Sequence, residues 1–270
     1  MTPAQLSRTA LHTLRRAGAD AAVLPERVVV EAPPRRGGGD YATGVALRVA
    51  ARAGRPALET AELLREGLAA EPGIADVRVV GPGFVNVTLS EDARADLVRG
   101  LAAGGPPGDP RDRPAVDIAR WAAATGEDPA ALAVRTARSS SLFRVQYAYA
   151  RTRAVLRNGR QLGVEPHHDG RAEDGAALLA LLADQARVAD QARVADQARV
   201  EDARAAGPLA RHLVAVADAF LDFHDSCPPL PSGDEKPGAA HRGRLALAEA
   251  TGAVLAGGLS LLGVSAPAHI

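Results

Sequence analysis

The chain has 270 residues, of which 47% are apolar, which is enough for two modest domains or one large domain with a buried core. Its formal net charge is zero, so composition neither supports nor excludes nucleic-acid binding, for which a local basic patch is sufficient. The single cysteine, Cys227, excludes an internal disulfide framework and fits a reducing cytoplasm, and no stretch approaches the roughly 20 apolar residues of a membrane span.

Residues 1–100 have the pattern of a small α/β domain. Thr2, followed by proline, is a helix start, and apolar residues follow it at helical spacing. Nothing in this opening resembles a secretory signal. The valine-rich segment 27–32 predicts a strand, and Asp40 is placed to cap a helix that follows it directly. A further helix is expected to begin at Pro56.

The segments 74–80 and 84–89 predict a β-hairpin, because a Gly-Pro-Gly turn joins two short apolar strands. In the second strand three apolar residues form a core face, and Phe84, Asn86 and Thr88 alternate with them on the other face. An aromatic ring, an amide and a hydroxyl suit the recognition of a nucleic-acid base by stacking and by an edge contact. The alternative is that a helix of the same domain covers Phe84.

Residues 101–114 predict a flexible linker, because they contain four prolines and three glycines. Strand signals are nearly absent from residues 115–270. The helices expected there are 115–124, 128–138, 141–158, 173–205, 208–225 and one or two between 238 and 263. The predicted fold is therefore α+β, with a small α/β domain followed by an all-α helical bundle.

A low-complexity insertion at about 160–207 interrupts the helical half. The sequence DQARV occurs three times between 184 and 200 with a period of six residues. Six residues turn a helix by about 600°, so each valine is rotated by about 120° from the last. We expect a solvent-exposed helical spacer. A coiled-coil partner face is the alternative, although a period of six argues against it.

Signatures of catalysis and of cofactor binding are missing from the sequence. There is no phosphate-binding loop, and Lys236, the single lysine, lies in a segment with loop composition. His167 and His168 are adjacent, a spacing at which two imidazoles rarely bind one metal ion. We therefore expect no catalytic residue, no cofactor and no metal.

The segment 141–160 carries the second candidate for RNA binding. Arg144, Tyr147 and Arg151 stand at i, i+3 and i+7 and share one helix face, and Gln146 adds a donor on a neighbouring face. An aromatic ring between two guanidinium groups suits an unstacked base flanked by phosphates. The alternative is a core tyrosine beneath solvated arginines.

Three motifs, in this order, resemble arginyl-tRNA synthetase. The run GDYAT with GPGFVNVTLS about forty residues later looks like the family's N-terminal domain, which contacts the D-loop corner of tRNA. The first helix of the family's DALR anticodon-binding domain looks like the segment FRVQYAYARTRAVLR. The end of that domain looks like the final segment of this chain, LALAEATGAVLAGGLSLLGVSAPAHI. The resemblance implies that Phe84 and Asn86 face the D-loop. It places Tyr147 toward the anticodon loop, with three polar neighbours: Arg144, Gln146 and Arg151.

The catalytic domain that this family places between the two halves has no counterpart, because only linker residues occupy its position. HIGH and KMSK motifs are absent, so aminoacylation is not expected. Gly44 and Tyr149 depart from the family's usual asparagine and histidine. The prediction is a cytoplasmic, non-catalytic protein that binds tRNA, in particular tRNA-Arg. Its other partners would be a synthetase or another translation protein, and it is not expected to bind a membrane. The alternative is a protein-interaction module that has lost RNA binding.

Overall fold

The computed structural model describes the chain except residues 32, 34–37, 105–107, 137, 170–174 and 198–205, and the side chains at 186, 187 and 190–197. The chain divides into two compact units, Met1–Leu97 and Val98–Ile270. Helices predominate, and the strands form one small sheet, so the α+β class is confirmed at this level.

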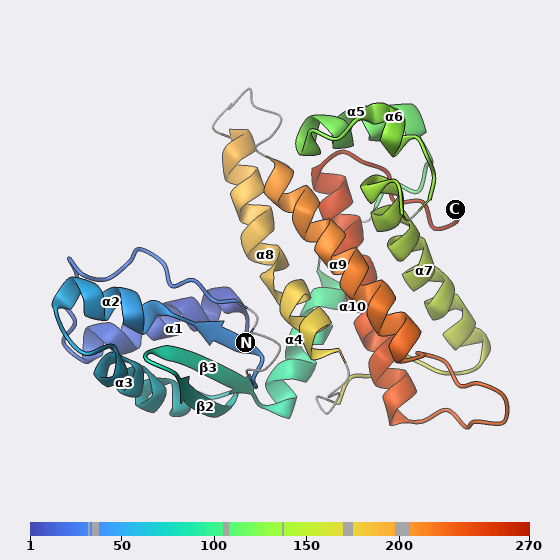
Figure 1. Ribbon diagram of the computed structural model, residues 1–270. Helices are drawn as coiled ribbons and strands as arrows, with labels where there is room; N and C mark the ends of the chain where they lie inside the picture. Colours follow the sequence, from blue (N-terminus) through green and yellow to red (C-terminus); the bar gives the residue numbers. More distant parts are fainter. Residues whose placement is uncertain (32, 34–37, 105–107, 137, 170–174, 198–205) are drawn as a thin grey trace. The chain divides into compact units, whose positions relative to one another are not determined.

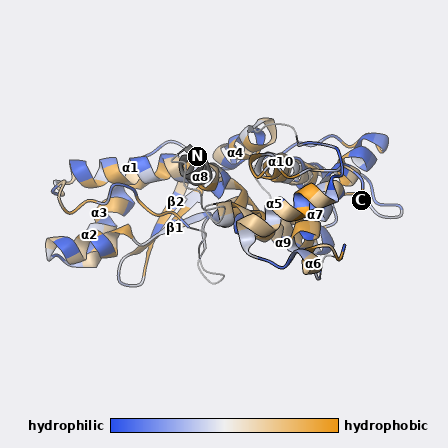
Figure 2. Cartoon of the chain, turned by 90° about the horizontal axis from the view of Figure 1, so that it is seen from above, coloured by the Kyte–Doolittle hydropathy of each residue, from blue (hydrophilic) through white to orange (hydrophobic). Residues whose placement is uncertain are grey.

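The first unit places helices against a three-stranded antiparallel sheet (Figure 1). Its elements are α1 (Pro3–Arg16), β1 (Tyr41–Thr43), α2 (Val45–Ala53), α3 (Ala57–Ala69), β2 (Ile74–Val80), β3 (Phe84–Leu89) and the start of α4 (Glu91–Ala103). The strand order is β1-β3-β2. Helices α2 and α3 pack on the sheet and α1 packs on α3. Figure 2 shows hydrophilic and hydrophobic residues alternating along these helices, as burial of one face requires.

Three of the expected elements of this unit are confirmed. Thr2 caps α1, since its hydroxyl accepts from the Gln5 amide at 3.2 Å while the Gln5 side chain accepts from Thr2. The hairpin pairs β2 with β3 from Val80–Phe84 to Ile74–Leu89. Helix α3 begins directly after Pro56, as expected.

Two other expectations for this unit are wrong. Of the described residues in 27–32, only Glu31 pairs with β1, through Ala42, because β1 is three residues long. The Val28 amide donates to the Ser7 hydroxyl. Asp40 does not cap a helix, because the residues after it form β1. Its buried carboxylate accepts from the Leu89 amide and pairs with the Arg94 guanidinium at 2.9 Å.

The second unit is a helical bundle. After the end of α4 it consists of α5 (Pro114–Thr125), α6 (Pro129–Leu132), α7 (Ser141–Gln161), α8 (Ala176–Gln197), α9 (Gly207–Ser226) and α10 (Ala239–Leu261). Helix α10 packs against α7, α8 and α9, and its residues are buried on nearly every side. Gly258 allows its close approach to α9, because a β-carbon there would overlap the Leu213 side chain.

The expected helix at 128–138 is shorter than predicted. Helix α6 ends at Leu132, whose carbonyl accepts from the Ser140 hydroxyl at 3.0 Å. The Thr136 hydroxyl also forms hydrogen bonds with the hydroxyl and the backbone amide of Ser139. Local hydrogen bonds to side chains compete with those of a helix, so the helix does not continue. Helices α5, α7 and α9 occur within a few residues of their predicted positions, and a single helix spans the region between 238 and 263. Of the helix predicted at 173–205 the structure shows α8, and the predicted residues 173–174 and 198–205 lie outside the described residues.

Two low-complexity segments are better packed than their composition suggests. In the expected linker, Gly108 lies against Ala256 and Ala266, and the Asp109 carbonyl accepts from the Ala266 amide at 2.7 Å. In the repeat, Val188 of the first copy is 4% exposed, because α8 packs on α9 and α10. A wholly solvent-exposed spacer is therefore wrong for this copy, and the side chains of the other two copies lie outside the described residues.

Candidate nucleic-acid interface

Phe84, the first residue of β3, presents one side of its ring to solvent. The residue is 48% exposed, although the next residue in the strand is fully buried. The covered side of the ring lies over the start of α2, where a β-carbon on Gly44 would be 3.2 Å from Phe84 Cε1. Glycine at 44 therefore gives the ring a flat support, and no helix of this unit covers its outer face. Such a half-exposed ring can stack on a base.

Asn86 has a different environment from the one that strand alternation predicted. The residue is 5% exposed, and its Nδ2 donates to the Gly38 carbonyl at 2.9 Å. The backbone around Gly39 lies across this face of β3, close enough that a β-carbon there would be 2.9 Å from the Val87 carbonyl oxygen. Asn86 therefore fixes the segment beside the hairpin and does not display its amide to solvent.

Exposed basic residues lie on α2, the helix whose start lies under this ring. Arg48 and Arg52 are exposed one turn apart on the helix whose first turn supports Phe84, and Arg55 is exposed just after the helix ends. Arginine presents five N–H donors in a planar fork that matches phosphate oxygens. The first unit thus offers a ring for a base and, on the neighbouring helix, donors for a phosphate backbone.

Helix α7 displays the second candidate surface, which we call the α7 strip: Phe143, Arg144, Tyr147 and Arg151. At about 100° per residue, these four side chains fall within roughly 100° of the helix circumference. Tyr147 is half-buried and Arg151 is exposed, so the arrangement is not that of a core tyrosine. The opposite side of α7 is buried against α9 and α10.

The aromatic members of the α7 strip are stacked on each other. The ring centroids of Phe143 and Tyr147 are 6.0 Å apart with an interplanar angle of 18°, and the guanidinium carbon of Arg135 lies 5.8 Å from the Phe143 centroid. Ser140 caps the helix by accepting from the Phe143 amide. Sequence reasoning missed Phe143 and Arg135, although an aromatic pair at i and i+4 on a helix is a recognisable signal.

The arginines of the α7 strip differ in their surroundings. Arg144 Nη1 lies 3.1 Å from Oδ1 and 3.3 Å from Oδ2 of Asp218 on α9, and the two side chains are 27% and 47% exposed. Arg151 is exposed two turns further along α7. The helix as a whole carries five arginines and no acidic residue between Ser141 and Gln161.

Gln146 is buried and forms part of a polar network inside the second unit. It is 4% exposed, and its Nε2 donates to the Ser265 carbonyl at 3.0 Å and to Asp117 Oδ2 at 3.3 Å. Asp117 is 1% exposed and also accepts from the Ser265 amide and hydroxyl. The network joins α5, α7 and the segment after α10, so Gln146 holds the bundle together rather than facing solvent.

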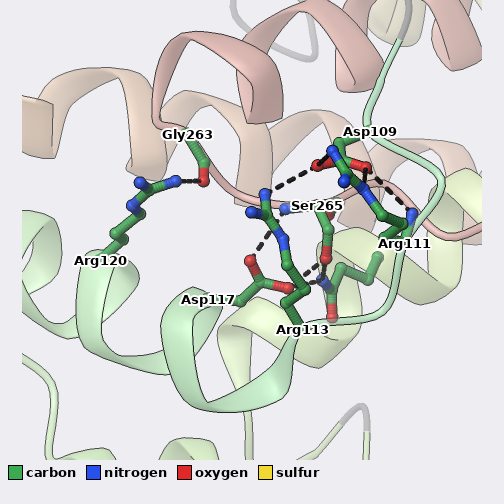
Figure 3. Close-up of polar contacts among 8 residues, drawn as sticks. Asp109, Arg111, Arg113, Asp117, Arg120, Gly263 and Ser265 are labelled. Carbon is green, nitrogen blue, oxygen red and sulfur yellow. Dashed lines mark hydrogen bonds and ion pairs between the residues drawn. The ribbon is translucent and has the colours of Figure 1, made fainter.

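An outer set of charges extends this network toward the expected linker (Figure 3). Asp109 receives hydrogen bonds from Arg111 and Arg113, and Arg120 donates to the Gly263 carbonyl. The hydrogen bond from the Arg111 side chain is the main reason that the pKa of Asp109 lies below its ordinary value. The Asp109 contacts hold the segment before α5 together, and the Arg120 contact attaches α5 to the segment that follows α10.

Within the described residues, no three His, Cys, Asp or Glu side chains are grouped so as to hold a metal ion. In the part of the chain that the structure describes, no helix has the length and apolar character needed to cross a membrane.

Both units contain segments that match families of known proteins. Residues 5–89 match the model of the arginyl tRNA synthetase N terminal domain, and residues 145–270 match that of the DALR anticodon binding domain. An arginine–tRNA ligase of Frankia alni is 43% identical over 108 residues, which are 39% of this chain and 20% of that protein. The chain thus spans about a fifth of the length of this relative. The arginyl-tRNA synthetase of Thermus thermophilus has a similar fold, with a TM-score of 0.53 at 11% identity, over all of both chains.

Proposed function

Because the chain is related to arginyl-tRNA synthetases through its N-terminal domain and its DALR domain, we propose that it binds tRNA without aminoacylating it. The observation that carries the proposal is the α7 strip at the start of the DALR match. It combines two stacked rings with guanidinium groups, which is the chemistry that unstacked bases and phosphates require. Residues 1–100 and 115–270 would act as two RNA-facing domains on either side of the 101–114 linker.

In this proposal Tyr147 and Phe84 stack on bases in two different parts of one tRNA. Arg151 and Arg144 contact phosphates beside Tyr147. Asn86 and Gln146 act as positioning residues, because each is buried and bonded to the backbone that shapes its surface. The proposed ligand is tRNA-Arg, in accordance with the name of the matching N-terminal domain, and the proposed site of action is the cytoplasm.

The non-catalytic part of the proposal is supported by what activation of an amino acid requires. The family matches leave residues 90–144 between them, a stretch that contains α5 and α6 but matches no catalytic domain among the families found. HIGH and KMSK motifs do not occur in the sequence. We therefore propose that this chain holds or delivers tRNA, alone or with a synthetase or another translation protein.

The proposal is tested by tRNA binding to the purified protein at about 50 mM and about 200 mM salt, since phosphate contacts lose affinity steeply with salt over this range. Tyr147→Ala and Phe84→Ala should each weaken binding. Leu162→Ala and Leu58→Ala, which truncate exposed apolar side chains elsewhere on the two units, should not. ATP–pyrophosphate exchange by the pure protein would contradict the non-catalytic part. A pulldown that survives nuclease and recovers no tRNA would favour a protein-interaction module.

A further inference from the structure

The α7 strip carries a built-in competitor for RNA phosphates, and this inference rests on the proposed function. Arg144 is one of the two arginines flanking Tyr147, yet its guanidinium faces the Asp218 carboxylate through Nη1, at 3.1 and 3.3 Å from the two oxygens. A carboxylate and a phosphate present the same pair of acceptor oxygens to an arginine. Asp218 therefore occupies donors that an RNA phosphate would use.

The charge on α9 favours the same conclusion. Asp218, Asp222 and Asp225 are spaced at i, i+4 and i+7, so they follow one face of α9, and Asp222 and Asp225 are exposed. Helix α9 packs on α7, whose only charged residues are arginines. An acidic face next to a basic one lowers the local potential that would attract a polyanion.

We propose that Asp218 limits the affinity and the salt dependence of RNA binding by holding Arg144, and that release of this ion pair accompanies contact with a phosphate. Neither side chain is buried, so exchange of one anion for another needs no unfolding of the bundle. An ion pair that is partly open to solvent is weak enough to be replaced by a phosphate of a bound polyanion. Asp218 is in this respect a specificity-determining residue, since only a ligand with a phosphate placed beside Tyr147 gains from the exchange.

The test compares tRNA binding by the wild-type protein, Asp218→Asn and Asp225→Asn. Asp225 lies two turns further along α9 and is 85% exposed, so its substitution makes the same charge change without touching the Arg144 ion pair. Asp218→Asn should tighten binding by about three- to tenfold, the scale of the net free energy of one ordinary hydrogen bond. It should also steepen the salt dependence by about 0.7 log unit per log unit for one added single-strand phosphate. Asp225→Asn should change both values less.

A second pair of variants, Arg144→Gln with and without Asp218→Asn, tests whether the effect of Asp218 depends on Arg144. In an Arg144→Gln background, Asp218→Asn should give no gain, because the released donor is absent. Equal gains from Asp218→Asn and Asp225→Asn, a persistent gain in the Arg144→Gln background, or weaker binding by Asp218→Asn would each overturn the inference while tRNA binding stands. Absence of binding by wild type and Asp218→Asn alike would overturn the inference together with the proposed function.

Discussion

We expect Gln146 to stabilise the bundle beneath the α7 strip and not to contact RNA, and the substitution Gln146→Ala distinguishes these two roles. Gln146→Ala removes the donor to the Ser265 carbonyl at 3.0 Å and to Asp117 Oδ2 at 3.3 Å. Because Gln146 and Asp117 are 4% and 1% exposed, water cannot replace these bonds without opening the bundle. A buried group left without its partner costs about 1–3 kcal/mol, and the lost packing adds to this. We expect the free energy of unfolding to fall by about 2–4 kcal/mol.

The assay is urea unfolding followed by circular dichroism, with thermal unfolding alongside. The expected loss lowers Tm by roughly 5–15 °C for a chain of this size. Gln161→Ala is the matched control, because it removes the same side chain from an exposed position at the end of α7. The folded fraction of Gln146→Ala should bind tRNA far better than Tyr147→Ala does. Wild-type stability combined with a tenfold or greater loss of tRNA affinity would refute the structural role.

Three further outcomes are expected. Tyr147→Ala should weaken tRNA binding by about 1–3 kcal/mol, the value of one stacked base, with unchanged stability as the internal control. Arg94→Ala should destabilise the first unit by about 2–4 kcal/mol in urea unfolding, because it leaves the nearly buried Asp40 carboxylate without its partner. In an NMR titration the pKa of Asp109 should lie below its ordinary value and return toward it in Arg111→Ala. Since the folded-state pKa is lowered, this ion pair stabilises the protein above the ordinary carboxyl pKa and is lost as pH falls through the lowered value.

The sequence predicted those parts of the fold whose signals are local. Thr2 with its following proline starts α1, the Gly-Pro-Gly turn sets the hairpin, and the long helices follow from apolar spacing. Elements decided by distant partners were missed. Asp40 looked like a helix cap because its contact with Arg94, fifty-four residues away, cannot be read from neighbouring residues.

The candidate site divides in the same way. The common face of Tyr147 and Arg151 follows from helix geometry and could be predicted. The burial of Gln146 depends on Ser265, which is 119 residues away in the chain. Asn86 lies on the predicted face of its strand, but a loop covers that face, and strand alternation contains no information about such a cover.

The most direct test of the central claim is recovery of RNA by the purified protein from total tRNA at low salt, with the bound species sequenced. If the protein binds tRNA-Arg as proposed, arginine tRNAs are enriched over the input, and the enrichment falls in both Tyr147→Ala and Phe84→Ala. Failure to retain any tRNA at about 50 mM salt, where phosphate contacts are strongest, would contradict it.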